Sequence, residues 1–236
     1  MTQTPHDMTP VFSPETLGFP EGLDFRQGLE RLSGRGEIKA KLLLVALTHF
    51  AKRGYDGVQV REVAEEAGVS KPTLYYHFIS KEGLFRQLCL VSMAATAHRI
   101  QAIVKPLLEL DLKDPAVRTE ACHRLGRDYL AALEEFPEFT GFILRSIAVP
   151  SPDSGFRDLM PLVEKGLSPI GLFIHTAFGC DFEQARKEML LFTGIFGALV
   201  EEKLRHAEYQ AGEAEAAWAT RRWLGGIEGQ CGFPRG

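Results

Sequence analysis

One short segment of the chain gathers side chains that can contact a polyanion. The sequence "GVSKPTLYYHF" covers residues 68–78 and holds a lysine, a threonine, two adjacent tyrosines and a histidine. Lysine supplies charge for phosphate, and tyrosine supplies a hydroxyl for phosphate and a ring face for a sugar or a thymine methyl group. Adjacent helix positions diverge by about 100°, so Tyr75 and Tyr76 cannot both be buried. The segment indicates a nucleic-acid surface. The alternative that one of the two tyrosine rings is a core residue is left open.

The charge distribution supports this interpretation. Residues 37–105 hold ten Lys/Arg against six Asp/Glu, whereas residues 1–36 hold three against five and residues 106–236 hold fourteen against twenty. Only the middle block is basic in a chain whose formal charge is -4. A basic block of this kind is typical of a surface that faces a polyanion, and it is also compatible with a solvated face.

The elements that would position these side chains form a helix-turn-helix over residues 60–79. This motif needs a small residue inside its first helix, a residue that tolerates positive φ at the turn and an apolar residue inside its second helix. Ala64, Gly68 and Leu74 stand at those positions. The remaining buried contacts are expected from Val63, Ala67, Val69 and Phe78.

The second helix of the motif has a clear start and a clear outer face. Ser70 follows the turn and can cap the helix, and Pro72 lies in the first turn, where proline is tolerated. With Leu74 and Phe78 pointing inward, the outer arc and the N-terminal end carry Lys71, Thr73, Tyr75, Tyr76 and His77. In this motif the N-terminal end of the second helix enters the major groove.

The segment "AEEAGVSKPTLYYHFISKEGLF" resembles the DNA-binding signature of the tetracycline-repressor (TetR) family of transcriptional regulators, and "FAKRGYDGVQVREVA" before it is similar to that family's first helix and turn. The resemblance covers about residues 37–90. It implies a homodimer on a palindromic operator. It also implies DNA contacts from Lys71, Thr73, Tyr75, Tyr76 and His77, with Lys81 on phosphate. Pro72 replaces the usual glycine, and Gln59 stands near a usual Thr or Ser cap.

The whole chain is predicted to be all-α. Apolar periodicity and breakers predict helices over residues 37–53, 60–67, 81–104 with a stop near Pro106, 115–136, 137–148, 156–178, 181–209 and 213–225. Four predicted regions follow: a largely disordered arm over 1–36 that permits a short helix at 21–33, a helix-turn-helix domain over 37–80, a helical effector-binding and dimerisation domain over 81–229, and a tail over 230–236.

The last two predicted helices are candidates for a dimer interface. "LLFTGIFGALVEE" and "AAWATRRWLGGI" resemble the two helices that pair between protomers in the TetR family, and the first is apolar around much of its circumference. The candidate interface residues are Phe192, Gly194, Ile195, Gly197, Ala198, Trp218 and Trp223. A purely intrachain core remains the alternative.

An effector pocket is expected among the central helices. Its candidates are His123, Tyr129, Phe139, Phe142, Arg145, Phe173 and His175, each of which has an ordinary packing role as its alternative. Arg145 lies in "FILRSIAV", and a charge in apolar company needs a partner. That partner is either an anionic ligand or one of Asp128, Glu135 and Glu138.

These patterns predict a sequence-specific DNA-binding regulator, most simply a homodimeric repressor released by a small apolar or amphipathic effector. An activator, or a regulator without an effector, is the alternative. No hydrolase, P-loop or zinc signature is present, so we expect no enzyme, no cofactor and no metal site. The four cysteines lie far apart, and redox activity is left open. With no signal peptide and no spanning segment, a cytoplasmic location without membrane contact is expected.

Overall fold

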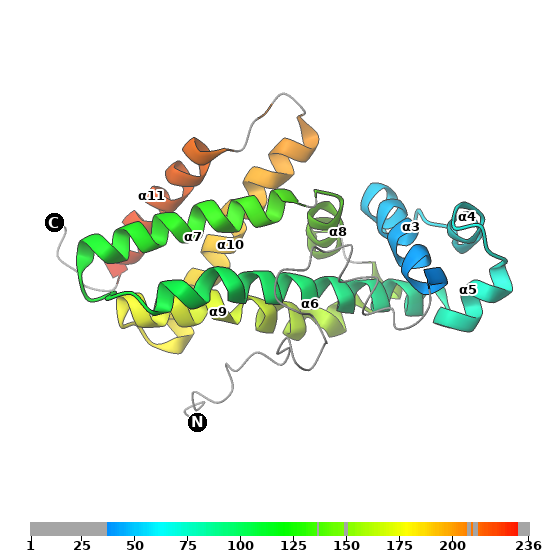
Figure 1. Ribbon diagram of the computed structural model, residues 1–236, viewed down its shortest axis with the longest axis horizontal. Coiled ribbons are helices and arrows are strands. Elements are labelled where there is room, and N and C mark those ends of the chain that lie inside the picture. The colour runs from blue at the N-terminus through cyan, green and yellow to red at the C-terminus, as the bar shows by residue number, and fades with distance from the viewer. Residues whose placement is uncertain (1–36, 136, 149–150, 207–208, 210–211, 231–236) are drawn as a thin grey trace. The chain divides into compact units, whose positions relative to one another are not determined.

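The computed structural model describes residues 37–135, 137–148, 151–206, 209 and 212–230. Throughout these residues the regular elements are helices and no strand occurs (Figure 1), which confirms the predicted all-α class. The arm over 1–36, its short helix at 21–33 and residues 231–236 of the tail lie outside the described residues.

The elements follow one another along the chain with short connections. They are α3 Glu37–Arg53, α4 Val60–Glu66, α5 Lys71–Phe78, α6 Lys81–Leu108, α7 Pro115–Glu135, α8 Pro137–Ala148, the 3-10 helices η2 Pro152–Ser154 and η3 Phe156–Leu159, α9 Met160–Phe178, α10 Phe182–Arg205 and α11 Glu213–Gln230.

Contacts divide the described chain into two compact units. The N-terminal unit contains residues 37–98, 137–148 and 151–164, and the C-terminal unit contains residues 99–135, 165–206, 209 and 212–230. Helices α6 and α9 each contribute to both units. The unit that holds the helix-turn-helix therefore also includes α8 and the two 3-10 helices, which come about sixty residues later in the sequence.

Local capping explains where most helices begin and end. Gly54 ends α3 at φ 68°, and its N–H donates to the carbonyl of Phe50 at 2.9 Å. The side chains of Asp114 and Asp181 accept hydrogen bonds from the first turns of α7 and α10, at 2.8 Å in each case. These are the short polar caps that satisfy otherwise unpaired helix N–H groups.

Three predicted boundaries are wrong. Helix α6 continues through Pro106 to Leu108 instead of stopping before it. Proline has no N–H to donate to the carbonyl four residues earlier, so it removes one backbone hydrogen bond. This close to the end of the helix, few turns remain to be disrupted. Helix α10 ends at Arg205, before the predicted limit of 209, and α11 continues to Gln230, beyond 225.

Four phenylalanine rings form the centre of the N-terminal unit. Phe85 on α6 packs edge-on against Phe50 of α3 at 5.1 Å between centroids and against Phe142 of α8 at 5.4 Å. Phe156 of η3 lies 6.3 Å from Phe85 and is fully buried. Helix α8 therefore packs on α3 as part of the same core as the helix-turn-helix.

The C-terminal unit is built on the packing of α7, α10 and α11. Tyr129 of α7 contacts Phe192 and Phe196 of α10, at 5.6 and 5.8 Å between ring centroids. Trp223 of α11 then contacts Phe192 at 5.1 Å and Phe178 of α9 at 5.8 Å. The side chains of Tyr129, Phe178, Phe192, Phe196 and Trp223 are thus buried against one another within one chain.

Candidate nucleic-acid interface

The turn between α4 and α5 has the backbone that the sequence predicts. Gly68 adopts φ 69°, and its N–H donates to the carbonyl of Glu65 at 3.0 Å. Val69 N–H donates to the carbonyl of Ala64 at 2.9 Å. These bonds close the end of α4 and reverse the chain toward α5. Ala64 and Ala67 are buried at 1% exposure, so the two helices approach closely at small side chains.

Helix α5 starts at the cap expected from its sequence. The Ser70 hydroxyl accepts a hydrogen bond from the Thr73 backbone N–H at 3.2 Å and lies 2.8 Å from the Thr73 hydroxyl. Pro72 occupies the first turn. Leu74 and Phe78 are buried and fix the inner face of the helix. The predicted cap and inward residues are therefore confirmed.

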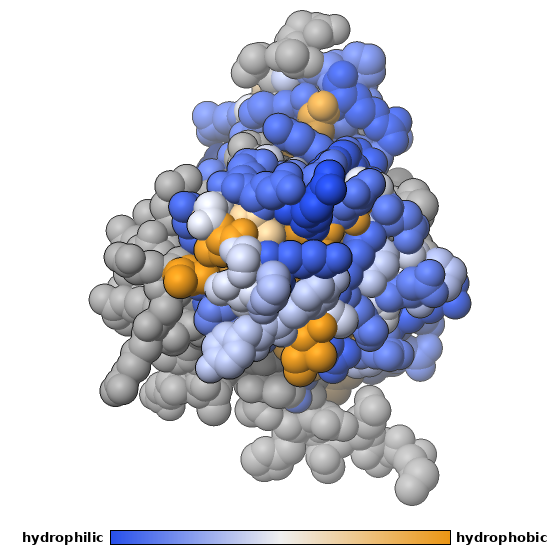
Figure 2. Space-filling model, turned by 90° about the vertical axis from the view of Figure 1, so that its right-hand side faces the viewer, coloured by the Kyte–Doolittle hydropathy of each residue, from blue (hydrophilic) through white to orange (hydrophobic). Residues whose placement is uncertain are grey.

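The outer face of α5 carries the side chains proposed to contact DNA. Tyr76 is 84% exposed and Tyr75 is 37% exposed, so neither tyrosine is a core residue. Lys71 and Pro72 are also exposed, while Thr73 and His77 are half-buried. The side of the molecule on which α4 and α5 lie faces the viewer in Figure 2, where hydrophilic side chains dominate and apolar ones form separate spots.

Two lysines extend from this face over aromatic rings. Lys71 Nζ lies 5.6 Å from the ring centroid of Tyr75. Lys81, at the start of α6, lies 4.5 Å from the ring centroid of Tyr55, and its Nζ donates to the Asp56 carbonyl at 3.5 Å. Burial lowers the pKa of Lys81, and the nearby Asp56 carboxylate acts in the opposite direction. Both cations thus lie beside aromatic rings near the recognition helix.

A polar network fastens α4 to α3 and so fixes the position of the motif. His49 Nε2 lies 2.7 Å from Glu66 Oε2, and Arg53 Nη2 lies 2.7 Å from Glu62 Oε2. Arg53 also contacts His49 Nδ1. The hydrogen bond and charge of Arg53 lower the pKa of Glu62 below its ordinary value. This network is at the surface, so it orients α4 more than it stabilises the unit.

Gln59 lies at the N-terminal end of α4 without capping it through its side chain. Its backbone carbonyl accepts from the Glu62 N–H at 3.0 Å, and its side chain is exposed. A glutamine amide is a poor cap compared with Ser or Thr. Contact between the Gln59 side chain and DNA stays a prediction.

The sequence interpretation missed Ile79, which follows α5 directly. Ile79 is 86% exposed and has φ 64°, the one positive φ outside glycine among the described residues. The available signal was its position: Phe78 already fills the inward position, so the next residue of the helix must point elsewhere.

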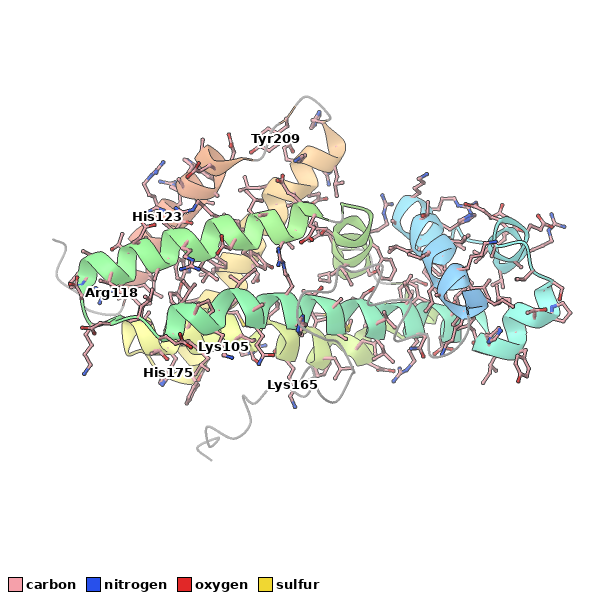
Figure 3. All side chains as sticks on the ribbon, viewed as in Figure 1. Lys105, Arg118, His123, Lys165, His175 and Tyr209 are labelled. Carbon is pink, nitrogen blue, oxygen red and sulfur yellow. The ribbon has the colours of Figure 1, made fainter. Side chains whose placement is uncertain are left out.

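The candidate effector residues are divided between the two units. Phe142 and Arg145 belong to the N-terminal unit, whereas His123, Tyr129, Phe173 and His175 belong to the C-terminal unit (Figure 3 labels the two histidines). The Phe139 side chain lies outside what the structure describes. Phe142 and Phe173 are fully buried in packing contacts.

Two of the polar candidates have different surroundings from those expected. Arg145 is exposed and its aliphatic stem lies over Gly54, although its neighbours in sequence are mostly apolar. In this part of α8 Phe142 and Ser146 are buried while Arg145 and Ile147 are exposed, which hydropathy along the sequence does not reveal. His175 stacks on Phe182 at 4.1 Å between ring centroids, and its Nδ1 lies 2.6 Å from the Cys180 carbonyl oxygen.

Tyr129 is a third polar candidate. Its side chain is buried, and this burial raises the pKa of its hydroxyl.

A pocket of about 240 Å³ opens between α6 and α7 inside the C-terminal unit. None of the six candidates whose side chains the structure describes lines it. Four apolar residues, two arginines and one aspartate line it, namely Arg99, Ala102, Ile103, Pro106, Arg124, Asp128 and Ala131. The arginines form ion pairs with Glu135 at 3.1 Å and Asp128 at 3.6 Å.

The candidate dimer residues separate into buried and exposed groups. Phe192, Gly197 and Trp223 are buried within the chain's own core, so the intrachain alternative applies to these three. Gly194 and Ala198 on α10 and Trp218 on α11 remain exposed, and Ile195 is half-buried. Leu190 and Leu191, also on α10, are apolar side chains that are 40% and 55% exposed.

Nothing among the described side chains suggests a metal or a membrane span. They contain no group of three or more His, Cys, Asp or Glu that could hold a metal ion. Across the described helices, none combines the length and the apolarity that crossing a bilayer would require.

Comparison with solved structures relates the fold to known regulators. The chain superposes on a protein from Shewanella sp. PV-4 assigned to the tetR family of transcription regulators with a TM-score of 0.64, 22% identity and coverage of 81% of this chain and 98% of that one. It also superposes on FadR from Bacillus subtilis, solved in complex with stearoyl-CoA, with a TM-score of 0.57, 16% identity and coverage of 79% and 97%. At these identities the likeness concerns the fold.

Sequence relatives match over shorter stretches. The icaADBC negative transcriptional regulator IcaR of Staphylococcus aureus (strain Newman) is 38% identical over 50 residues, which are 21% of this chain and 27% of IcaR. The regulator YerO of Bacillus subtilis (strain 168) is 31% identical over 108 residues, 46% of this chain and 34% of YerO. The chain thus spans about a quarter to a third of the curated relatives that it matches.

The family model described as "Bacterial regulatory proteins, tetR family" matches residues 42–88. These residues run from α3 through the helix-turn-helix into α6. They include the Gly68 turn, the Ser70 cap and the exposed tyrosines of α5. Through this domain the chain is similar to the tetR family of bacterial regulatory proteins.

Proposed function

We propose that the protein is a transcriptional regulator that reads a palindromic DNA operator through α5 as a homodimer. The observation that carries the proposal is the arrangement of α5, where Leu74 and Phe78 are buried while Tyr76 and Lys71 are exposed beside the capped N-terminal end. A two-fold dimer places two such helices one helical turn of DNA apart, about 34–36 Å.

The dimer is proposed to form through exposed faces of α10 and α11. Leu191, Gly194 and Ala198 are exposed positions within about two turns of α10, and Trp218 on α11 is 51% exposed. A side-chain carbon added at Gly194 or Gly225 would meet nothing within 4 Å, so a second helix can approach the backbone there. An exposed apolar surface of this kind is typical of a protein interface.

Repression relieved by an effector is the mode of action that we propose. IcaR is a negative regulator by its name, and FadR was solved with stearoyl-CoA bound, which supports an amphipathic ligand. An effector of this class acts only through different affinities for the DNA-binding and released states.

The test of DNA recognition is selection from random double-stranded DNA with the purified protein. We expect an inverted repeat to be enriched. Lys71→Ala should then weaken binding and make the slope of log affinity against log salt shallower by about one for each phosphate that Lys71 neutralises. Lys113→Ala, an exposed lysine between α6 and α7, is the matched control. Failure to enrich any sequence would contradict the proposal.

The test of the dimer is sedimentation of Leu191→Glu, which places a charge on the exposed face of α10. We expect a folded monomer, because the monomer core does not use this side chain. Leu110→Glu changes a 39% exposed leucine between α6 and α7 and should leave the dimer intact. A dimeric Leu191→Glu variant would contradict the assigned interface.

A further inference from the structure

Ile79 forms a strained turn between the recognition helix and α6. It adopts φ 64° and ψ -45°, and the Ser80 N–H donates to the Phe78 carbonyl at 2.7 Å. A hydrogen bond across a single central residue with positive φ is a γ-turn of the rare, unfavourable type. For a β-branched side chain such a φ is an outlier.

The surrounding residues hold this turn in place. The Ser80 hydroxyl accepts a hydrogen bond from the Gly83 N–H at 2.9 Å and so caps α6. A side-chain carbon at Gly83 would lie 2.1 Å from the Phe78 carbonyl oxygen, so only glycine permits this approach. Ile79 N–H also donates to the Tyr75 carbonyl at 2.8 Å. The turn geometry is thus fixed by its neighbours on both sides.

Packing within the chain does not explain an isoleucine at this position. Its side chain is 86% exposed, so burial within the chain contributes little to compensate for the strain. Glycine or asparagine would adopt this φ at lower cost. Strained backbone that persists in a turn held by its neighbours is a frequent sign of a functional position.

The place of Ile79 indicates what it contacts. It follows Tyr75 and Tyr76 by four and three residues, and Tyr76 is similarly exposed. This exposed side chain therefore lies immediately beyond the end of α5, next in sequence to the side chains proposed to contact DNA. An isoleucine offers no hydrogen bond and no charge, so phosphate is excluded as its target. The apolar group that the major groove presents is the C5-methyl of thymine.

We propose that Ile79 is a sequence-reading residue that packs on a thymine methyl group in each half-site of the operator. The proposal rests on the proposed function of α5 and adds an apolar contact outside the recognition helix itself. The strained turn places the Ile79 side chain at the groove, and thymine is preferred there over bases that lack the methyl group.

The experiment combines a variant with a change in the DNA. Operator obtained by selection is prepared with each thymine in turn replaced by deoxyuridine, which removes only the methyl group. Wild-type protein should lose about fourfold in affinity for each single replacement at one symmetric pair of positions, as expected for an apolar contact of one methyl group. Ile79→Gly removes this contact in both half-sites, so it should already bind the unmodified operator about fifteenfold more weakly, and it should show no further loss at that pair.

Stability and control variants make the outcome unambiguous. Ile79→Gly relieves the backbone strain, so its melting temperature should equal or exceed that of the wild type. Ile79→Asn, which also tolerates positive φ, should bind as weakly as Ile79→Gly. Ile147→Ala removes a 42% exposed isoleucine on α8 and should leave operator affinity unchanged.

Several results would overturn the inference. Wild-type affinity in Ile79→Gly would show that the side chain is not used. Equal sensitivity of wild type and variant to deoxyuridine at every position would exclude methyl reading. A lower melting temperature in both variants would show that Ile79 serves the fold. If selection enriches no DNA, the proposed function fails first and the inference falls with it.

Discussion

Ser151 donates its hydroxyl hydrogen to the carboxylate of Asp56, with 2.9 Å between Oγ and Oδ1 across 95 residues of sequence. Asp56 lies in the turn between α3 and α4, and Ser151 precedes η2. The hydrogen bond therefore joins the segment that precedes η2 to the turn between α3 and α4. Both lie in the N-terminal unit. Phe156, five residues after Ser151, anchors this segment in the core.

Ser151→Ala should loosen this segment without unfolding the unit. A largely solvent-exposed hydrogen bond contributes about 1 kcal/mol, so the melting temperature should change little while hydrogen exchange of residues 153–156 becomes faster. Phe156→Ala is the contrasting variant and should cost about 3–5 kcal/mol of unfolding free energy. Unchanged exchange in Ser151→Ala would mean that the hydrogen bond does not hold the segment.

Tyr76→Ala should separate DNA binding from stability. The ring is 84% exposed, so its removal should leave the melting temperature within about a degree and weaken operator binding by about tenfold. Leu74→Ala, two residues earlier on the buried face, should instead cost about 2–5 kcal/mol of unfolding free energy. Gel-shift titration and thermal denaturation of both variants measure the two effects. Equal operator affinity for Tyr76→Ala and wild type would remove Tyr76 from the interface.

Ser70 offers a test of the helix cap. Ser70→Ala leaves the Thr73 N–H without its side-chain acceptor and should cost about 1 kcal/mol of unfolding free energy. Ser70→Asp restores a cap and should recover stability, because a carboxylate also suits a helix N-terminus. The same negative charge would face phosphate, so operator affinity should fall in the Asp variant. If Ser70→Asp had both the stability and the operator affinity of the wild type, Ser70 would not lie near the DNA.

Gly126 marks a close crossing of α7 and α11. A side-chain carbon there would lie 2.2 Å from Thr220 Oγ1 and 3.0 Å from Phe196 Cζ. Gly126→Ala should therefore destabilise the C-terminal unit by about 1–3 kcal/mol through overpacking. Thr220 Oγ1 is buried and has no hydrogen-bond partner among the described residues, so Thr220→Ala alone should be nearly neutral.

The double variant Gly126→Ala, Thr220→Ala should recover part of the stability, because it removes the atom that clashes. Urea denaturation of the four proteins gives the coupling free energy between the two positions. Additive effects of the two substitutions would contradict the predicted clash.

The pair of Glu62 and Arg53 predicts a sensitivity to acid. Arg53 lowers the pKa of Glu62, so the carboxylate form is favoured in the folded state. Its contribution is present above the unfolded-state pKa of about 4.3 and is lost as the pH falls through the lower folded-state pKa. Glu62→Gln should therefore flatten the decline of melting temperature between about pH 5 and pH 3. Identical pH profiles for variant and wild type would exclude this pair as a contributor.

The sequence was sufficient to predict helix α5 in detail. The Ser70 cap, the Gly68 turn and the division between Leu74 inside and Tyr76 outside all depend on residues within about one helical turn of one another. Local backbone geometry and helical periodicity determine such features directly.

Other features depend on which surfaces meet. Helix α8 joins the core of the helix-turn-helix unit, and Arg145 lies at the surface despite its apolar neighbours in sequence. Phe192 and Trp223 face each other inside the chain, although the same residues would suit a dimer interface. Hydrophobicity alone does not distinguish these arrangements, because it favours burial without specifying the partner.

The sequence by itself determined that the chain is helical and that α5 presents tyrosines and lysine outward, because capping and periodicity act over a few residues. Only the tertiary structure decided that residues after α8 complete the N-terminal unit and that Ile79 stands in a strained turn. The first outcome arises from contacts between segments far apart in the sequence, such as Phe85 with Phe156 and Asp56 with Ser151. The second depends on the close approach of the Gly83 backbone to the Phe78 carbonyl.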